Sequence, residues 1–457
     1  IMDFILLAYD LICSHLYSSE FGFFSVVAFN NFKSQYKPIN SKNSKIDSIQ
    51  DEGWKYFNEK GLPPNPETIE LWKYTNFHGL DSLKFSSPNQ TIIDEEAEKK
   101  LFTNKKYNNI FVVDGFFDQG KSNLSENIIV ENSSNLDKLD YLADTFGKIA
   151  KNGENEFISL NSSLMIDPLF ISIKDSAVPI DVNIIMVTTN NSPNSYFFPR
   201  IFLQVEKNSS ANIIESYFNL SEEKSKNLVV PVIEYLLEDN SKVNHKRMQI
   251  DSGDSYFFQF DRILQKADSS FISTSFSLSG LVSRYDIHSD LVGINSECNL
   301  HGLYLTNSDQ LQENEISITH SVEKCSSDQM FKGILAGKSK AVFSGKVLVK
   351  QDAQKTRAFQ KDLNFLLSKD CEVDTKPSLE IYADDVECSH GATAGNMDKN
   401  MLFYLQSRGI NSDDAMAMLI RGFAQEIIDE FDDEKIIEFL ENSVDKIIPK
   451  LDIEGIM

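Results

Sequence analysis

The chain has 457 residues and a formal net charge of −24, from 44 basic and 68 acidic side chains. A surface this acidic repels phosphate backbones and anionic lipid, so we expect neither a nucleic acid nor a membrane as a partner. The five cysteines form no C-x-x-C motif, which argues against a disulfide framework or a self-contained zinc ribbon and favours a reducing cytoplasm.

Residues 1–30 are apolar, but Asp3, Asp10, His15 and Glu20 interrupt the run. It has no basic n-region and no small-residue cleavage site, so we expect neither a signal peptide nor a membrane helix. Because the sequence opens on Ile, we treat these residues as an extension of uncertain origin that need not be native.

Residues 31–107 have the pattern of a mostly helical, polar N-terminal domain. Gly61 and three closely following prolines interrupt it, as a helix stop followed by an extended connection would. Aromatic side chains more often pack than bind ligands, so we expect Trp72 and Tyr74 to anchor this segment onto the next domain.

Residues 108–395 change to short runs of alternating apolar and polar residues, rich in β-branched and aromatic side chains. Few helical stretches separate these runs, which disfavours a doubly wound α/β fold. The runs of strand length are FVVDGFF (111–117), DVNIIMVTT (181–189), RIFLQVE (200–206), NIIESYFNL (212–220), FISTSFSLSG (271–280), CNLHGLYL (298–305), AVFSGKVLVK (341–350) and LEIYADDV (379–386).

A short polar turn followed by alternating residues recurs six times in this region. The intervals are 27 to 32 residues, with one of 43. A repeat of this kind favours the stacked coils of a β-solenoid over a sandwich. The turns are KNSSAN, DNSKVN, ADSSFI, INSECN, GKSKAV and KDCEVD, beginning at residues 207, 239, 267, 294, 337 and 369.

Residues 396–457 have the pattern of a helical C-terminal domain. Asp398 is a suitable N-cap for a first helix that stops at Gly409, and Asn411 or Ser412 can cap a second. A third helix is predicted over about 434–446 from its apolar stripe. These stripes must pack on the end of the solenoid or on a partner.

The stretch IYADDVECSHGATAG (381–395) places Cys388 and His390 two positions apart. In a strand both side chains lie on one face, roughly 6.5 to 7 Å from each other. That is long for the contact of about 3 Å that a nucleophile and its base require. The spacing suits two ligands that meet a metal or a partner surface, and a buried cysteine packed beside a histidine is the other interpretation that stays open.

Several long segments resemble the SufB/SufD family of iron-sulfur cluster assembly proteins. The resemblance extends over most of the chain from residue 71 onward and is densest from 310 to 423. The segments that carry it are WKYTNF (72–77), SDQMFKGIL (327–335), AVFSGKVLVKQDAQKT (341–356), NFLLS (364–368) and LEIYADDVECSHGATAGNMDKNMLFYLQSRGI (379–410).

This resemblance implies a mainly β fold, a right-handed parallel β-helix core with helical N-terminal and C-terminal segments. It implies a non-catalytic scaffold whose β-helix pairs with the paralogue SufB and whose C-terminal helices bind the ATPase SufC. Sulfur-donor proteins would act through SufB. No nucleotide would be bound by this chain, and its sequence contains no P-loop. The partner-binding positions implied are Leu402, Tyr404, Arg408, Gly409, Arg421 and Phe423.

The resemblance also implies that iron or a transient cluster is held at the surface facing SufB. Cys388 and His390 are the candidate ligands, because thiolate and imidazole suit iron-sulfur chemistry. The C-S-H-G-A-T stretch, with Gly391, resembles the SufD form of the family, whereas SufB-type members resemble one another in having Glu there. SufB-like sequences resemble one another in having a cysteine at the position of Cys371, so we keep Cys371 as a further candidate ligand. The alternative is that it is a small buried residue in a turn.

Outside the family, two enzyme classes stay open. Asp384, Asp385 and Glu387 lie close together, as the carboxylates of a β-helix polysaccharide lyase or hydrolase would. Cys388 and His390 would serve a cysteine hydrolase only if the thiol were unusually reactive.

Overall fold

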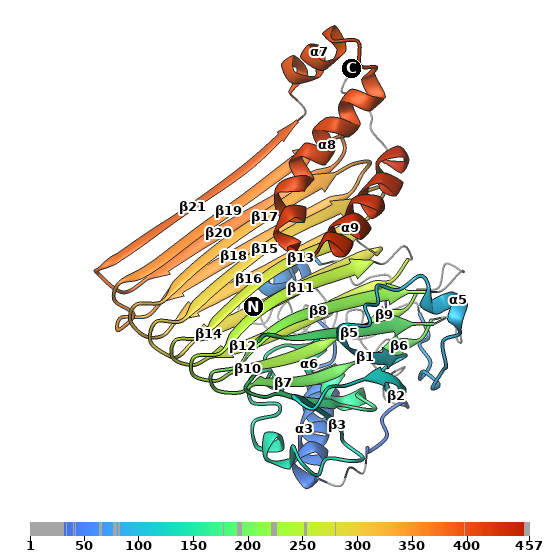
Figure 1. The fold of residues 1–457 in the computed structure, drawn as a ribbon, viewed down its shortest axis with the longest axis vertical. Coiled ribbons are helices and arrows are strands. Elements are labelled where there is room, and N and C mark those ends of the chain that lie inside the picture. The colour runs from blue at the N-terminus through green and yellow to red at the C-terminus, as the bar shows by residue number, and fades with distance from the viewer. Residues whose placement is uncertain are drawn as a thin grey trace, which may run out of the picture.

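The computed structural model describes residues 32–451, apart from 33, 40, 42, 64–65, 76–79, 81–82, 177, 190–193, 221–225, 251–253, 279, 397 and the side chain of 450. The apolar stretch at 1–30 lies outside the described residues. The fold is mainly β, a parallel β-solenoid flanked by helices near both ends of the chain, as expected (Figure 1).

Two long sheets form the solenoid. The first sheet has the order β2-β1-β5-β8-β11-β13-β15-β17-β19-β21, and the second has the order β20-β18-β16-β14-β12-β10-β7-β4-β3. Each of the seven regular coils of the solenoid consists of one strand of the second sheet followed by one strand of the first. The coils are β7 (Arg200–Val205) and β8 (Ser210–Asn219); β10 (Val232–Leu237) and β11 (Lys242–Ile250); β12 (Tyr256–Gln265) and β13 (Ser270–Leu278); β14 (Val282–Leu291) and β15 (Glu297–Thr306); β16 (Leu311–His320) and β17 (Ser326–Leu335); β18 (Lys340–Val349) and β19 (Thr356–Leu366); β20 (Glu372–Ile381) and β21 (Val386–Asn396).

The first coils are less regular. Their strands are β1 (Asn108–Val113), β2 (Phe116–Asn123), β3 (Ile128–Asn132), β4 (Leu169–Ile173), β5 (Ile180–Thr188), β6 (Tyr196–Phe197) and β9 (Leu228–Val229). The pairs β1–β2 and β3–β4 are antiparallel, whereas the strands that follow pair in parallel and in register.

Two of the predicted strands were wrong in extent. FVVDGFF is a hairpin, because Asp114 and Gly115 both adopt positive φ (53° and 87°) and form the tight turn between β1 and β2. LEIYADDV is not continuous either, since residues 382–385 make the corner between β20 and β21. In both cases the predicted strand ran across a turn, at Asp114–Gly115 in the first and at a corner that contains Asp384 and Asp385 in the second.

In the first six regular coils, the corner that leads from the second sheet into the first places one residue in the left-handed region. Asn240 Nδ2 donates to Asn208 Oδ1 at 2.9 Å, and Asn295 Nδ2 donates to Asp268 Oδ1 at 2.8 Å, so the corners form a ladder of side chains. Asparagine and aspartate tolerate this conformation because their short polar side chains bond locally. The left-handed residues are Asn208, Asn240, Asp268, Asn295, Lys324 and Lys355, 27 to 32 residues apart.

The long interval of 43 residues in the predicted repeat has a simple cause. The first four turns lie at the corner just described, whereas GKSKAV and KDCEVD lie at the opposite corner, where the first sheet leads into the second. The period of the solenoid is unchanged, and only the corner that carries the polar signature differs.

The interior of the solenoid is apolar for most of its length, with a buried polar network in the middle coils. Glu215 accepts hydrogen bonds from Tyr217 (2.6 Å) and Tyr235 (2.7 Å). Arg247 donates to Ser277 Oγ at 2.9 Å, and its guanidinium lies 4.1 Å from the ring centre of Tyr285. Each of these charged groups is fully buried and partnered, as burial of a charge requires.

Helices cover the outer faces of the sheets. Those before or within the first coils are α3 (Ser44–Lys60), η1 (Pro66–Thr68), η2 (Glu70–Trp72), α5 (Glu95–Glu98), η3 (Asp140–Asp144) and α6 (Glu156–Leu164). Trp72 is 1% exposed and packs edge-on against Phe157 at 5.3 Å, which confirms the anchoring prediction.

The C-terminal helices begin beyond the ends of the strands and then lie over the outer face of the first sheet (Figure 1). They are α7 (Lys399–Ser407), α8 (Ser412–Ile428), η4 (Asp429–Phe431), α9 (Glu434–Ile447) and η5 (Ile448–Lys450). Asp398 and Asn411 cap α7 and α8 as predicted, and Gly409 has φ 90°.

The corner ladder predicts opposite effects of two substitutions. Asn240→Ala should lower the free energy of unfolding by about 1 to 2 kcal/mol, because alanine is strained at positive φ and makes no ladder bond. Lys324→Asn should raise it by about 0.5 to 1 kcal/mol. Urea unfolding followed by far-UV circular dichroism measures both. Asn240→Gly is the matched control, because glycine relieves the strain, and equal losses for Ala and Gly would contradict this account.

Candidate functional site

The last coil carries the candidate ligands. Strand β21 pairs with β19 in parallel, with Cys388 opposite Ala358 and His390 opposite Gln360. Its residues are nearly all exposed. The first sheet ends at β21 and the second at β20, so among the described strands nothing pairs with the outer edge of either (Figure 1). The solenoid is therefore open at this end.

Cys388 lies on the inner face of the strand. It is half-buried and packs with Val347, Val349 and Ala358 of the preceding coil. Burial raises the pKa of its thiol, and a backbone hydrogen bond from Ala358 opposes this only in part. A raised pKa is the reverse of what a nucleophilic cysteine needs, so the geometry does not favour a cysteine hydrolase.

His390 follows two residues later on the same face and is exposed. The pair brings one sulfur and one imidazole to the rim of the open coil. Over the residues that the structure describes, no three His, Cys, Asp or Glu side chains come together as a metal site. The pair supplies two donors, whereas iron in sulfur-rich sites usually takes four.

The structure does not bring Cys371 to this pair. Cys371 is 6% exposed at the opposite corner, and its sulfur donates to the Ser368 carbonyl at 3.1 Å. The ten residues of β20, at roughly 3.3 Å each, separate that corner from the one before β21. It packs with Tyr304, Leu335 and Ala341, as a small apolar residue in a turn does.

The acidic residues next to the pair face elsewhere. Glu387 Oε2 accepts a hydrogen bond from Arg357 Nε at 3.1 Å, on the outer face of the sheet. The backbone N–H of Asp385 donates to Gln354 Oε1 at 2.9 Å in the corner, next to Asp384. Corner residues beside an exposed ion pair do not form the facing carboxylates that glycoside cleavage requires.

The implied partner-binding residues fall into two groups. Tyr404 and Arg408 are exposed on α7, where Arg408 lies 5.3 Å from the Tyr404 ring centre, and Arg421 forms an exposed ion pair on α8. Leu402 is buried, and Phe423 packs against Phe365.

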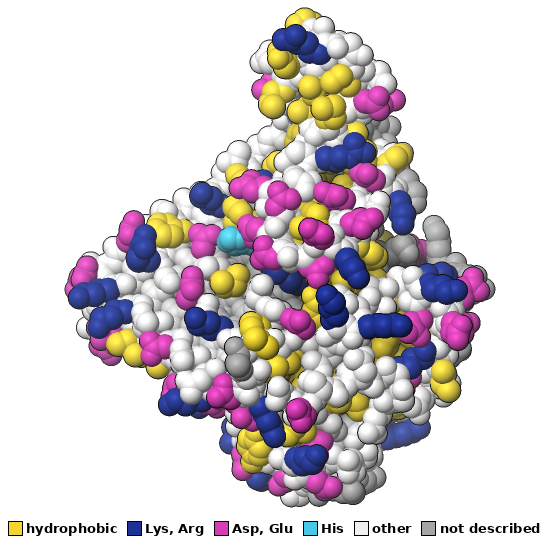
Figure 2. Space-filling model, viewed as in Figure 1, with side chains coloured by type: hydrophobic (Ala, Val, Ile, Leu, Met, Phe, Trp, Pro, Cys, Tyr) yellow, Lys and Arg dark blue, Asp and Glu magenta, His cyan; other side chains and the backbone are white. Residues whose placement is uncertain are grey.

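Sequence reasoning missed two further residues of α7, Met401 (55% exposed) and Phe403 (71%). Figure 2 shows hydrophobic side chains gathered over α7, with acidic side chains over α8 and α9. The signal was present in the run MLFYL, because five consecutive apolar residues exceed what one face of a helix can bury.

Cationic residues on the outer face of the first sheet hold α8 and η4 in place. Lys332 pairs with Glu426 and donates to the Phe423 carbonyl at 3.1 Å. Lys246 donates to the Glu430 carbonyl and also faces Asp432. We call these contacts, together with those of His301, the cationic clamp.

His301 is the titratable member of the clamp. Its Nε2 lies 2.7 Å from Asp328 Oδ2, and its Nδ1 lies 2.8 Å from Glu430 Oε2. Burial disfavours the charged ring, but hydrogen bonds to both carboxylates outweigh it and raise the pKa of His301 to about 9. The imidazolium therefore bridges the sheet and the helices at neutral pH.

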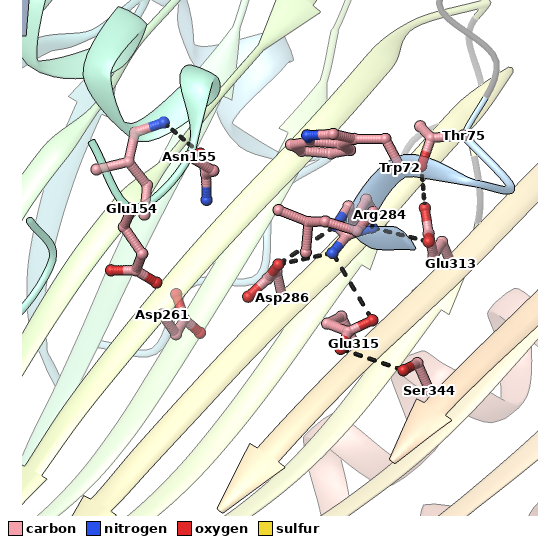
Figure 3. A network of polar contacts seen from close by, with 12 residues as sticks. Trp72, Thr75, Glu154, Asn155, Asp261, Arg284, Asp286, Glu313, Glu315 and Ser344 are labelled. Carbon is pink, nitrogen blue, oxygen red and sulfur yellow. Dashed lines mark hydrogen bonds and ion pairs between the residues drawn. The ribbon is translucent and has the colours of Figure 1, made fainter. Parts of the chain in front are cut away.

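A second cluster of charges lies on the outer face of the second sheet, beneath the N-terminal segment (Figure 3). Arg284 is fully buried under the Trp72 ring (4.6 Å), and it contacts Asp286 at 2.9 Å and Glu313 at 2.7 Å. Thr75 Oγ1 donates to the other oxygen of Glu313 at 2.5 Å. Clustered buried charges are typical of an active site, but these contacts join the N-terminal segment to the sheet.

Comparison with known proteins defines the class of this chain. Residues 187–423 match the SUF system FeS cluster assembly SufBD core domain, and residues 28–184 match the SufBD protein N-terminal region. The first match alone spans more than half of the chain, and it covers the regular coils, α7 and the first part of α8. The chain belongs to the SufBD family of iron-sulfur cluster assembly proteins.

Individual relatives agree with this membership. The chain is 31% identical over 378 residues to the iron-sulfur cluster assembly protein SufD of Escherichia coli, covering 82% of this chain and 86% of the relative. It is 30% identical over 376 residues to a SufBD family protein of Synechocystis, covering 79% and 82%. It is 32% identical over 247 residues to the chloroplastic protein ABCI7 of Arabidopsis thaliana, covering 54% and 52%. Within the described part of the chain, no helix is long and apolar enough to cross a bilayer.

The raised pKa of His301 predicts a pH-dependent attachment of the C-terminal helices. Its stabilisation is complete below the ordinary pKa of 6.5, shrinks as the pH rises above that value, and is gone above about 9. His301→Gln should therefore lose on the order of 2 to 3 kcal/mol at pH 7 and almost nothing at pH 10. Hydrogen exchange of the α8 amides at several pH values measures this difference.

Arg421→Gln, also in α8, is the control, because it breaks an exposed ion pair with Asp445 of α9, and such pairs contribute little. A loss in His301→Gln that stays constant from pH 6 to 10 would refute the role of the imidazolium.

Proposed function

We propose that this chain is a non-catalytic scaffold subunit of a cytoplasmic SufBCD-type complex that assembles iron-sulfur clusters. Its solenoid pairs with a SufB-type paralogue, its C-terminal helices bind the ATPase SufC, and iron or a nascent cluster binds at the junction of the two solenoids. The nucleotide belongs to SufC, and sulfur donors act through SufB. Membership of the SufBD family and the resemblance within β21 to the SufD form support this proposal.

The observation that carries the proposal is the open end of the solenoid. Strand β21 has eleven residues, and its outer edge offers backbone N–H and C=O groups to another strand. An exposed edge of this length is a template for strand addition. A second solenoid placed there would cover the inner-face residues of the last coil, among them Cys388 and His390.

The chemistry of the pair fits iron. A thiolate and an imidazole are both ligands of iron-sulfur centres, and histidine in place of cysteine raises the reduction potential of such a site. The two donors lie at the rim of the open coil, so the remaining ligands would come from the paired subunit. A cluster held between two subunits can be released when they separate. Cys371, with its sulfur turned into the opposite corner, stays a weaker prediction as a ligand.

The surface of α7 supports the proposed contact with SufC. Phe403 and Tyr404 present large aromatic side chains to solvent, and exposed aromatics with an adjacent arginine are typical of the centre of a protein interface. The cationic clamp connects α8 to the β-strands of the solenoid. Movement of the helices when SufC closes on ATP would thus reach the sheet that ends in β21.

The ligand role of the pair is tested with the assembled complex. Complexes containing wild type or Cys388→Ala/His390→Ala are purified anaerobically with SufB and SufC, and their iron and acid-labile sulfide are quantified. We expect the double variant to assemble but to retain at least tenfold less cluster, because two donors are lost.

Ser389→Ala is the matched control, since this neighbour of both ligands lies on the outer face of the same strand. Equal cluster content in wild type and double variant would assign Cys388 and His390 to packing and leave a scaffold that acts through its surfaces.

The α7 surface predicts a separable defect. Phe403→Ser/Tyr404→Ser should weaken SufC binding by on the order of 2 kcal/mol or more, about 30-fold, while pairing with SufB is unchanged. Affinity is measured by titrating SufC onto the purified pair. Ile92→Ser, which removes an exposed apolar side chain elsewhere (81% exposed), is the control. Unchanged SufC affinity in the double variant would exclude α7 as the binding surface.

A further inference from the structure

A column of polar side chains lies inside the first sheet beneath His390. The register of the strands places Gln329 of β17 beside Gln360 of β19, and Gln360 beside His390 of β21. Side chains at these positions point into the solenoid, since Gln329 is 0% and Gln360 is 2% exposed. Three successive coils therefore stack an amide, an amide and an imidazole at one position.

The amides have a defined direction. Gln360 Nε2 donates to Gln329 Oε1 at 2.8 Å, toward the interior of the solenoid. The other end of the same amide, Gln360 Oε1, is buried and has no hydrogen-bond partner among the residues that the structure describes. A buried acceptor without a donor has lost its hydration without compensation, so such an atom needs an explanation. Gln329 Nε2, at the far end of the pair, is likewise buried without a partner among the described residues. On the open side of the column, the position in register with Gln360 is His390.

We propose that Gln360 is a positioning residue for His390, and that its Oε1 accepts the N–H of the imidazole nitrogen that does not bind iron. This inference rests on the proposed function of His390 as a ligand. A neutral imidazole has one donor and one acceptor nitrogen, so a fixed acceptor beneath the ring decides which nitrogen remains for the metal. The hydrogen bond fixes the tautomer and the ring orientation and makes the ligating nitrogen more basic.

This role explains a position that sequence reasoning did not single out. Gln360 lies on the inner face of β19, two residues after Ala358, which is fully buried and packs near Cys388. The coil beneath the open end thus places a methyl group in register with the thiol and an amide in register with the imidazole. The paired subunit is then required to supply further ligands but not the orientation of His390.

The experiment uses the complete anaerobic complex with SufB and SufC. Gln360→Met keeps the length of the side chain and removes the acceptor, so it should weaken Fe²⁺ binding 10- to 100-fold, as the loss of such a partner of a ligating histidine does. The same variant should change the ¹⁴N coupling of the reduced cluster in pulsed electron paramagnetic resonance. Gln360→Glu keeps an acceptor and should restore both quantities to within about threefold of wild type.

The matched control is Gln312→Met in the second sheet. Gln312 is also fully buried, and its amide bonds within its own strand, to Asn314 Oδ1 at 3.2 Å. It should lose stability as Gln360→Met does while iron affinity and ¹⁴N coupling stay at wild-type values. Wild-type affinity and coupling in Gln360→Met would overturn the inference. Wild-type values in His390→Ala as well would show that the proposed ligand role itself is wrong.

A measurement on the wild type alone covers the case in which Gln360→Met does not fold. In the complex loaded with Zn²⁺ as a diamagnetic probe, nuclear magnetic resonance of ¹⁵N-labelled histidine should show a His390 N–H that exchanges at least tenfold more slowly than that of an exposed imidazole. An N–H that exchanges as fast as in free imidazole would also overturn the inference.

Discussion

Each coil of this solenoid satisfies its backbone hydrogen bonds only by pairing with the coil before it and the coil after it. The long parallel strands pair in register, and a residue in the left-handed conformation recurs at the corners of one side. Each end of such a stack leaves strand edges that could pair with a further coil, so the ends require structures that the middle does not. The antiparallel pairs β1–β2 and β3–β4 complete one end. At the other end, β20 and β21 are uncovered, and this is where the candidate ligands lie.

A small number of basic residues attach the helical segments of this acidic chain to its sheets. Arg284 attaches the N-terminal segment to the second sheet, and Lys246, His301 and Lys332 attach the C-terminal helices to the first. Each of these cations is largely buried and has a carboxylate partner, so removal of one partner would leave an uncompensated charge.

The position of His390 shows how the inner coils set the surroundings of a residue at the open end. A side chain on the inner face of β21 has a neighbour fixed by register in β19, and that neighbour has another in β17. The environment of a residue at the open end is therefore set by coils that no partner touches. A scaffold of this kind can present a partly built site whose missing ligands arrive with the second subunit.

Much of the fold followed from sequence alone, because it depends on local patterns. Alternation identified most strands, Asp398 and Asn411 identified helix starts, and the polar turns identified a solenoid. The predicted strands ran across turns at Asp114–Gly115 and at residues 382–385, although Asp-Gly and Asp-Asp are residues that favour turns. The two-residue spacing singled out Cys388 and His390, and the alternation of the strand placed them on one face. The resemblance then suggested that they are ligands.

The sequence by itself determined which residue types are present, their period and the family, since these are properties of neighbours along the chain. Only the tertiary structure decided which corner each polar turn occupies, that Cys371 lies away from Cys388, that His301 joins Asp328 to Glu430, and that Gln360 lies beneath His390. The pairs that are brought together lie about 30 to more than 100 positions apart in the sequence, whereas Cys371 and Cys388 are close in sequence but apart in space. The stacking and register of the coils set both outcomes.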